Sequence, residues 1–379
     1  MASDLHKRLS TSVSVRGRFS LFCGPTAAPE PLPRRPVRST HLECMTLSVR
    51  GPDELVAAIP HLLGFQPEES IVFIPMRSEL PIARVDIPTT PRDREMVWHS
   101  IGDAYGRHSR PGSSVAIVCL CADRENAEVV GQDFVARLES IGIDTHVLMW
   151  ADDTRWADLD TGDMGLRTDA AREHVASMSV LAGRPQPAAS RDSLAATLVG
   201  DPEPVAALLP AAEEAAAAST PRAEGRWALG RLKQFHHDGH RLSDGDSARL
   251  LVALDSTPIR DSLWDDMSPS NVTSHVALWT DLTKRAPDDV RAEPASLLGF
   301  ASWLSGSGAM AWCALDQIPE GKQTNLAGLV ASAVQGGVNP RVWETAKAKD
   351  TAREVDSATD LVARRATAQS ATTRPAHGI

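Results

Sequence analysis

Residues 62–88 read LLGFQPEESIVFIPMRSELPIARVDIP, and this stretch decides how the first half of the chain folds. Two runs in it, residues 71–74 and 82–87, are rich in the β-branched and aromatic side chains that favour strands. A polar turn, RSEL, joins the two runs, so we expect them to pair as antiparallel neighbours. Residues 52–63, directly before, repeat apolar side chains at helical spacing and lead into Gly64, which indicates a helix that stops there.

The same half continues with alternating helices and strands. Residues 92–105 and 125–141 have helical patterns, whereas residues 114–121 and 146–150 have the pattern of strands. An order of strand, helix, strand, helix, strand is typical of an α/β layer. We therefore predict an α/β domain over residues 45–185, built as a mixed sheet with flanking helices.

The second half has the pattern of an all-helical domain. Strand signals fade after residue 168, and the linker RPQPA predicts a domain boundary between residues 183 and 189. Alanine-rich and amphipathic segments follow, so we expect an all-α domain over residues 189–345. The expected helices lie at residues 190–198, 210–219, 222–237, 247–254, 272–284, 295–304, 310–318 and 326–335.

One segment of this helical half, residues 294–315, contains no charged side chain. A membrane span needs about 20 mostly apolar residues, and serines and glycines interrupt this stretch. We therefore expect a buried helical hairpin here and no contact with a membrane.

The two ends of the chain differ in composition from the rest. Residues 1–44 are rich in arginine and proline and lack the apolar run of a secretory signal. They predict a disordered extension, or an upstream extension of a gene whose working start is Met45 rather than Met1. Residues 346–379 are polar and rich in alanine, threonine and arginine, so we expect a disordered or frayed tail.

Length and composition narrow the class of protein. A chain of 379 residues is long enough for two domains of about 100–200 residues each. The formal net charge of −10 disfavours nucleic-acid binding, which depends on clustered lysine and arginine. Five cysteines form an odd, scattered set, unlike a secreted disulfide scaffold, so we expect a cytoplasmic protein. The motifs GxGxxG, GxSxG and HExxH and the P-loop motif are absent, which removes the commonest routes to a named enzyme class.

One polar group stands out in the predicted β-hairpin. Arg84 and Asp86 are two residues apart on a strand and therefore share a face, and Ser70 opens the neighbouring strand. A guanidinium held by a carboxylate beside a hydroxyl can bind a carboxylate or phosphate ligand. Arg191 joins this candidate site if the second domain places it there, at the interface between the domains. The alternative is a structural ion pair that fixes the register of the strands.

Three carboxylates follow predicted strands. Asp86, Asp123 and Asp152 each come just past a strand, and carboxylates at the carboxyl ends of parallel strands can hold a hard cation such as Mg²⁺. This reading requires the three strands to run parallel, whereas Asp86 lies on an expected hairpin. The alternative for Asp123 is to cap the helix that follows it.

Histidine and cysteine offer further candidates. The segment HHDGH holds His236, His237 and His240, a residue type that binds zinc, but its spacing matches no standard ligand motif and it falls at an expected helix end. Cys119 and Cys121 alternate on one face of a strand and are closer together than in a redox C-x-x-C motif, which favours buried apolar roles. We predict no metal and no cofactor.

Six stretches carry a resemblance to a known family. They are PDELVAAIPHLLGFQPEES (52–70), ARVDIP (83–88), SRDSL (190–194), RLSDGDSARLLVAL (241–254), IRDSLW (259–264) and ASWLSGSGAMAWCAL (301–315). In this order they resemble the actinobacterial family called domain of unknown function 4192, from about Met45 to Trp343. The resemblance implies no activity, cofactor or catalytic residue. Members of the family often have a Trp-rich, cysteine-containing segment after the fourth strand, whereas residues 154–169 here keep Trp156 without a cysteine.

The predicted function is that of a non-catalytic binding or protein-interaction protein whose helical domain contacts an unidentified protein partner. Tryptophans gathered in the helical half either line a groove for that partner or fill the helical core; they are Trp264, Trp279, Trp303, Trp312 and Trp343. The alternative is an enzyme acting on a phosphorylated or nucleotide-like substrate between the two domains. Its site would be Ser70, Arg84, Asp86 and Arg191.

Overall fold

The computed structural model describes residues 19–21, 47–76, 80–345 and 347. The first element among the described residues is β1 (Phe19–Leu21), which pairs antiparallel with β2 (Leu47–Val49) in a two-stranded sheet. β1 lies inside the extension 1–44 that we predict to be disordered, and it forms a strand. The rest of that extension and the predicted tail beyond residue 347 lie outside the described residues.

A six-stranded mixed sheet forms the centre of the N-terminal half, as the sequence predicts. Its strands lie in the order β4-β3-β5-β6-β7-β8. The expected hairpin is confirmed, because β3 pairs antiparallel with β4 and places Ser70 opposite Asp86. The strands are β3 (Ser70–Pro75), β4 (Ala83–Asp86), β5 (Ser114–Leu120), β6 (Asp144–Ala151), β7 (Arg155–Asp158) and β8 (Met164–Leu166).

Two crossover connections determine where the strand ends lie. β3 runs antiparallel to both β4 and β5, so β4 and β5 point the same way, and β6 lies parallel to β5. α2 (Pro91–His108) links β4 to β5, and α3 (Arg124–Ser140) links β5 to β6. Both connections step in the same direction across the sheet, and both helices cover the same face, as right-handed crossovers require. The carboxyl ends of β4, β5 and β6 therefore share one edge of the sheet.

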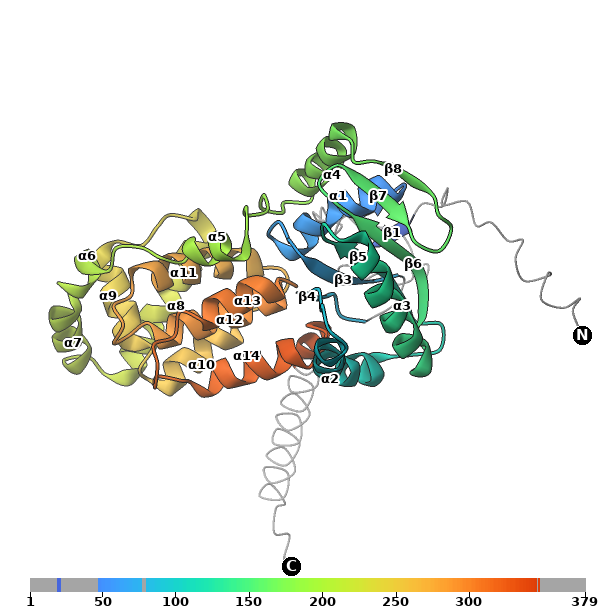
Figure 1. Cartoon of the computed structure of the whole chain (residues 1–379). Helices are drawn as coiled ribbons and strands as arrows, with labels where there is room; N and C mark the ends of the chain where they lie inside the picture. Colours follow the sequence, from blue (N-terminus) through green and yellow to red (C-terminus); the bar gives the residue numbers. More distant parts are fainter. Residues whose placement is uncertain (1–18, 22–46, 77–79, 346, 348–379) are drawn as a thin grey trace, which may run out of the picture. The chain divides into compact units, whose positions relative to one another are not determined.

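Helices on both faces of the sheet make three layers (Figure 1). α1 (Pro52–Leu63) and α4 (Asp169–Leu181) pack on one face, where Ile59 and Val175 join the apolar side chains of the strands. α2 and α3 pack on the other face through residues such as Ile101 and Leu138. β5 is buried along nearly its whole length because it receives cover from both sides.

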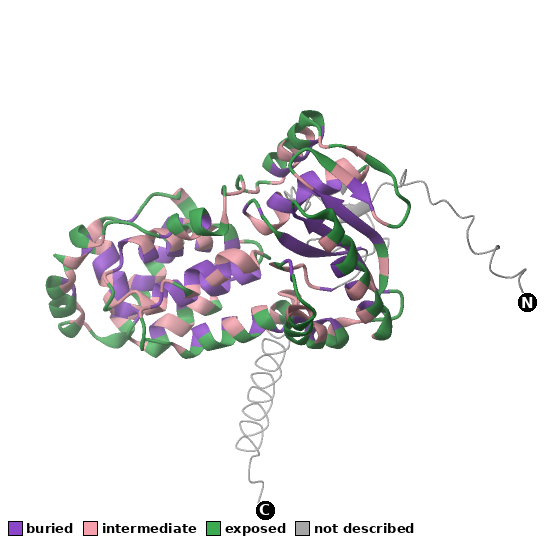
Figure 2. Ribbon diagram, viewed as in Figure 1, coloured by how far each residue is buried: buried purple, intermediate pink, exposed green. Residues whose placement is uncertain are grey.

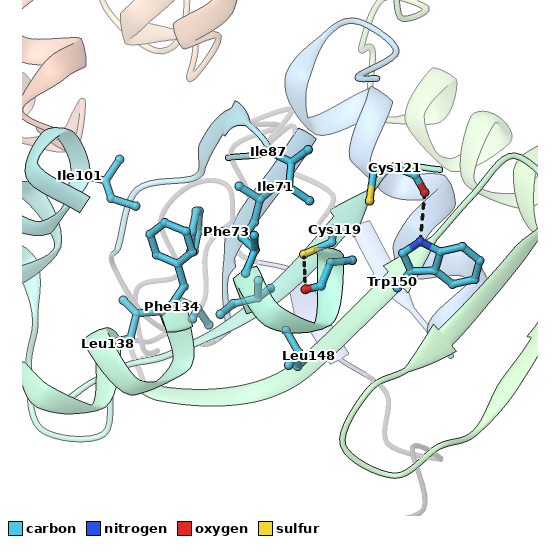
Figure 3. Close-up of a cluster of buried hydrophobic side chains, with 14 of the residues drawn as sticks. Ile71, Phe73, Ile87, Ile101, Cys119, Cys121, Phe134, Leu138, Leu148 and Trp150 are labelled. Carbon is cyan, nitrogen blue, oxygen red and sulfur yellow. Dashed lines mark hydrogen bonds between the residues drawn. The ribbon is translucent and has the colours of Figure 1, made fainter. Parts of the chain in front are cut away.

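Figure 3 shows the cluster of buried side chains that packs beneath α2 and α3. Phe73 of β3 meets the rings of Tyr105 and Phe134 edge-on, with centroid distances of 6.0 and 5.4 Å. Cys119 and Cys121 of the neighbouring segment belong to the same buried cluster, as predicted from their alternation. Colouring by burial shows the buried residues concentrated in the sheet and on the inner sides of its helices (Figure 2).

Local sequence signals fix the helix ends in this half. Gly64 ends α1 with φ of 85°, a left-handed conformation that glycine adopts without steric cost, and its N–H donates to the carbonyl of Pro60. Asp123 caps α3, since its side chain accepts a hydrogen bond from the N–H of Asn126 at 3.1 Å. The capping role that we weigh for Asp123 is thus observed.

The predicted linker is tied to the first half by backbone hydrogen bonds. Ala188 forms an isolated parallel bridge with Phe65, donating to the carbonyl of Gly64 and accepting from the N–H of Gln66, each at 2.9 Å. By their contacts, the described residues up to Val338 form one compact unit, so a domain boundary at 183–189 is not confirmed.

The second half of the chain is helical, as predicted. α12 is its most enclosed element, with every residue from Pro294 to Leu304 buried. α11, α13 and α14 contact it. The helices are α5 (Arg191–Ala196), α6 (Glu203–Ala206), α7 (Leu209–Ala217), α8 (Pro221–Asp238), α9 (Asp244–Ala253), α10 (Thr257–Asp265), α11 (Val272–Arg285), α12 (Ala292–Leu304), α13 (Gly308–Leu315) and α14 (Asn325–Gln335).

The uncharged segment 294–315 forms α12 and α13, which contact each other as the expected buried hairpin. Small residues allow this pairing: a Cβ atom added at Gly299 would lie 3.1 Å from Leu315 Cδ2. Within the described residues, the structure has no helix that combines the length and the apolar character of a membrane span.

Candidate functional site

The predicted group around Arg84 is brought together at the start of β3. Arg84 donates from Nε to Ser70 Oγ at 2.8 Å and from Nη2 to the carbonyl of Glu68 at 3.3 Å. Its Nη1 pairs with Asp86 Oδ1 at 2.8 Å, and the guanidinium carbon lies 5.9 Å from the centre of the Phe65 ring. Neutral acceptors and an aromatic face therefore orient the guanidinium before any anion reaches it.

The two members of the ion pair differ sharply in exposure. The side chain of Arg84 is 23% exposed, whereas that of Asp86 is 86% exposed. Asp86 therefore faces water, while Arg84 is largely enclosed by the protein. An ion pair with one partner so exposed contributes about 0–1 kcal/mol, because water competes for the carboxylate.

Ser70 is the best-fixed residue of the group. It is fully buried, its hydroxyl donates to the carbonyl of Glu68 at 2.5 Å, and it accepts from Arg84. No histidine, lysine or carboxylate is hydrogen-bonded to this hydroxyl among the described residues. Ser70 orients the Arg84 side chain through the hydrogen bond that it accepts from Nε.

Backbone strain adjoins the same group. Glu69 has φ of 37°, the one positive value among the described residues other than glycine. Its carboxylate accepts a hydrogen bond from the N–H of Ala122, just after β5, at 3.0 Å, and its carbonyl accepts from Ile87. Strained residues persist where neighbouring contacts over-determine them, and they concentrate at functional sites.

Arg191, the fourth predicted site residue, makes a different contact. It donates to Asp316 Oδ2 at 2.8 Å, which joins α5 to the end of α13. Across the described part of the chain, no hydrogen bond or ion pair links Arg191 to Ser70, Arg84 or Asp86. The structure therefore brings together three of the four residues.

The three carboxylates considered for Mg²⁺ do lie at one edge of the sheet, but each already has a local role. Asp86 pairs with Arg84, and Asp123 caps α3. Asp152 accepts hydrogen bonds from the N–H groups of Thr154 and Arg155, both at 2.7 Å. Burial alone would raise the pKa of Asp152, but these hydrogen bonds lower it below its ordinary value.

The topology also gives this edge no ready-made crevice. Ligand crevices in open α/β sheets form where successive connections diverge in opposite directions and their helices cover opposite faces. Here β4, β5 and β6 follow one another in a single direction, with α2 and α3 on the same face.

A cluster of histidine and aspartate lies in the helical half. His236 of α8 and His275 of α11 each place Nε2 at 3.2 Å from Asp266 Oδ2. Asn271 donates to the same oxygen at 3.0 Å, and His236 Nδ1 lies 2.7 Å from Ser274 Oγ. Of the three histidines in HHDGH, His236 alone belongs to this cluster, so the structure selects a different ligand set from the one that the motif suggests.

The hydrogen bond from Trp279 decides what this cluster can bind. Trp279 donates its indole N–H to His275 Nδ1 at 3.2 Å. An indole nitrogen is only a donor, so Nδ1 of His275 is the accepting nitrogen and Nε2 carries the proton that faces Asp266. A metal on Nε2 would move that proton to Nδ1, opposite the indole N–H. The side chains of the cluster therefore form a hydrogen-bonded network that joins α8 to α11.

A charged cavity in the helical half was not identified from the sequence. Its volume is about 470 Å³, within the range of small-molecule sites. It is lined by Gly200, Asp201, Pro204, Arg241, Asp244, Asp281, Lys284 and Arg285. The lining residues come from three separate segments, so no local motif marks them.

Contacts of three of the tryptophans bear on the two readings given above. Trp279 is fully buried and Trp303 nearly so, and Trp303 donates its indole N–H to the carbonyl of Val338. These two fill the helical core. Trp264 packs edge-on against Phe300, with ring centroids 5.3 Å apart. These contacts favour the core role over a partner groove.

Fold and sites together define a protein with a mixed α/β sheet, a helical half and charged candidate sites in each. The chain belongs to the family described as a domain of unknown function (DUF4192), which matches residues 52–341. This match confirms the resemblance seen in the six sequence stretches. Comparisons with curated proteins and with solved structures gave no match.

Proposed function

We propose that this protein is a non-catalytic binding protein that captures the acidic group of a small molecule at Arg84. The observation that carries the proposal is the asymmetry of the Arg84–Asp86 pair, in which the arginine is largely enclosed and the carboxylate is 86% exposed. A carboxylate or phosphate of the ligand takes the place of Asp86 beside Nη1. The displaced Asp86 turns into water at little cost because it is already hydrated there.

The geometry of the guanidinium supports this exchange. An arginine has five N–H donors, and Ser70, Glu68 and Asp86 engage three of them. The remaining two belong to Nη1 and Nη2, which are the two nitrogens that grip an oxyanion side by side. Ser70 and Glu68 contribute uncharged acceptors, so they orient the guanidinium without neutralising it.

No base is paired with the Ser70 hydroxyl in the part of the chain that the structure describes, which supports binding without catalysis. The Ser70 hydroxyl is buried and already engaged as both donor and acceptor. The alternative, an enzyme acting on a phosphorylated or nucleotide-like substrate, requires a different nucleophile at this site. The strain at Glu69, one residue before Ser70, supports a functional role for this corner of the sheet.

Two substitutions with opposite expected effects on anion affinity test the proposal. Inorganic phosphate, acetate, nucleotides and sugar phosphates are titrated into the full chain by calorimetry. Arg84→Lys keeps the charge but loses the paired donors, so affinity for the binding anion should fall by about tenfold or more. Asp86→Asn removes the competing carboxylate, so affinity should rise.

Asp169→Asn is the matched control. Asp169 is 84% exposed and pairs with Arg172, so its removal perturbs a comparable surface ion pair at another place. A structural ion pair that only fixes strand register predicts a lower melting temperature for Arg84→Lys and Asp86→Asn, without any change in anion binding. That result, or anion binding that Asp86→Asn weakens, would contradict the proposal.

A further inference from the structure

The cavity in the helical half is built from three segments that meet at the end of α11. The loop before α6 contributes Gly200 and Asp201, the segment leading into α9 contributes Arg241 and Asp244, and α11 contributes the remaining charged residues. Gly200 is needed for this approach, since a Cβ atom there would lie 2.7 Å from the carbonyl oxygen of Lys284. The loop thus rests directly on the backbone of α11.

Arg285 anchors the acidic side of the cavity. Its side chain is 4% exposed, Nη1 pairs with Asp244 Oδ1 at 3.0 Å, and Nη2 pairs with Asp281. Nη1 also donates to the carbonyl of Leu242. The N–H on Nε is buried without an acceptor among the described residues, which is rare in folded proteins and marks an incomplete polar network.

The residues that line the cavity carry equal numbers of positive and negative charges, but not every charge has a partner of opposite sign. The wall has three cationic and three anionic side chains. Asp281 pairs with both Arg241 and Arg285, so one carboxylate serves two guanidinium groups. Lys284 makes no ion pair within the described residues, and Asp201 uses one oxygen to accept from the N–H of Glu203. The ammonium group of Lys284 and a carboxylate oxygen of Asp201 therefore remain available to a ligand in the cavity.

We propose that this cavity binds a small zwitterion of the amino-acid type. Lys284 holds the acidic group of the ligand, and Asp201 together with the exposed side of Asp244 holds its amino group. A simple anion would meet three carboxylates on the wall, and a simple cation would meet three basic side chains. A molecule that carries both charges pairs with the acidic and the basic side chains at the same time. The equal numbers of the two kinds of side chain therefore favour a zwitterion.

The test uses the full chain and named probes. The twenty amino acids and phosphoethanolamine are titrated by calorimetry, with acetate and methylammonium as probes that carry only one of the two charges. At least one zwitterion should bind with a Kd below about 1 mM, and each single-charge probe should bind at least about tenfold more weakly. Lys284→Gln and Asp201→Asn should each weaken the zwitterion by about tenfold or more.

Two controls separate this cavity from other sites. Lys233→Gln removes an exposed lysine of α8 that does not line the cavity and should leave the affinity unchanged. The titrations are repeated in Arg84→Lys, which weakens the separate anion site proposed on β4, so that binding there is not counted as binding in the cavity. The inference is overturned if no zwitterion binds with a Kd below about 1 mM, or if neither Lys284→Gln nor Asp201→Asn weakens the binding.

Discussion

Trp279 donates its indole N–H to Nδ1 of His275, and this one hydrogen bond fixes which ring nitrogen of the histidine carries the proton. With Nε2 protonated toward Asp266, the cluster of His236, Asp266 and His275 has no free pair of histidine nitrogens to offer a metal. We therefore predict that Co²⁺ and Zn²⁺ at a slight excess over the protein leave its melting temperature unchanged. Co²⁺ should produce no visible absorption of a tetrahedral site.

Binding of Co²⁺ by this cluster would contradict the prediction. Visible Co²⁺ absorption that disappears in Asp266→Asn would show that Trp279 gives up its hydrogen bond and that the cluster is a metal site. Replacement of His240, which carries a side chain 87% exposed outside the cluster, is the control for binding to surface histidine.

The ion pair between Glu224 and Arg249 predicts a dependence of stability on pH. Arg249 donates from Nε and Nη2 to the two carboxylate oxygens of Glu224 at 2.8 and 2.7 Å, and the Glu224 side chain is 5% exposed. These hydrogen bonds hold the pKa of Glu224 below its ordinary value. The stability that this pair contributes is present above the unfolded-state pKa of about 4.3 and is lost as the pH falls through the lower folded-state pKa.

Glu224→Gln should lower the free energy of unfolding by about 1–3 kcal/mol at pH 7. The gap between wild type and variant should narrow as the pH falls below about 4.3, because the wild type loses the same charge. Urea unfolding at several pH values measures both. A gap that stays constant down to pH about 3 would show that the charge of Glu224 does not matter.

Two glycines in neighbouring helices give opposite predictions for the same change. A Cβ atom at Gly131 of α3 would lie 2.6 Å from Leu148 Cδ1, and Leu148 is fully buried and cannot swing away. Gly131→Ala should therefore destabilise the protein by about 1–3 kcal/mol. Gly106 of α2 has open space at the same position, so Gly106→Ala should stabilise it by about 0.5–1 kcal/mol. Equal effects of the two changes in thermal unfolding would contradict the packing seen between α3 and β6.

The thiols of the described residues should be unreactive in the folded protein. Burial raises the pKa of Cys119, Cys121 and Cys313, that of Cys121 to about 11. At pH 8 only about a thousandth of Cys121 is then thiolate, which is the reactive form. The double variant Cys23→Ser/Cys44→Ser retains only the three cysteines named above. It should release almost no colour from Ellman's reagent until denaturant is added. Rapid reaction of the folded variant would show that an element that buries one of these three cysteines opens readily.

The hairpin of β3 and β4 could be predicted because all its signals are local. Alternating apolar side chains, a polar turn and a preceding glycine stop lie within residues 62–88, and the observed register confirms them. The same holds for α3, whose cap Asp123 directly precedes it. Short-range hydrogen bonds and steric preferences determine these features, so a single stretch of sequence contains the information.

The strands β7 and β8 cannot be recognised in the sequence, because their local signals are weak. Arg155–Asp158 and Met164–Leu166 are short, partly exposed and mixed in polarity, so no periodic pattern identifies them. They form strands because the edge of β6 supplies hydrogen-bond partners, which continue the sheet outward. The helix α10 (Thr257–Asp265) was also missed, and it takes its place by burying Ile259 and Leu263.

By itself the sequence determined the class of each half, the hairpin and the meeting of Ser70, Arg84 and Asp86, because these depend on neighbours a few residues apart along one strand pair. Only the tertiary structure decided that Asp86 faces water, that Arg191 pairs with Asp316, and that His236 meets His275 across two helices. Such contacts are set by how whole elements pack, and packing sums many weak interactions over the fold rather than following any one segment.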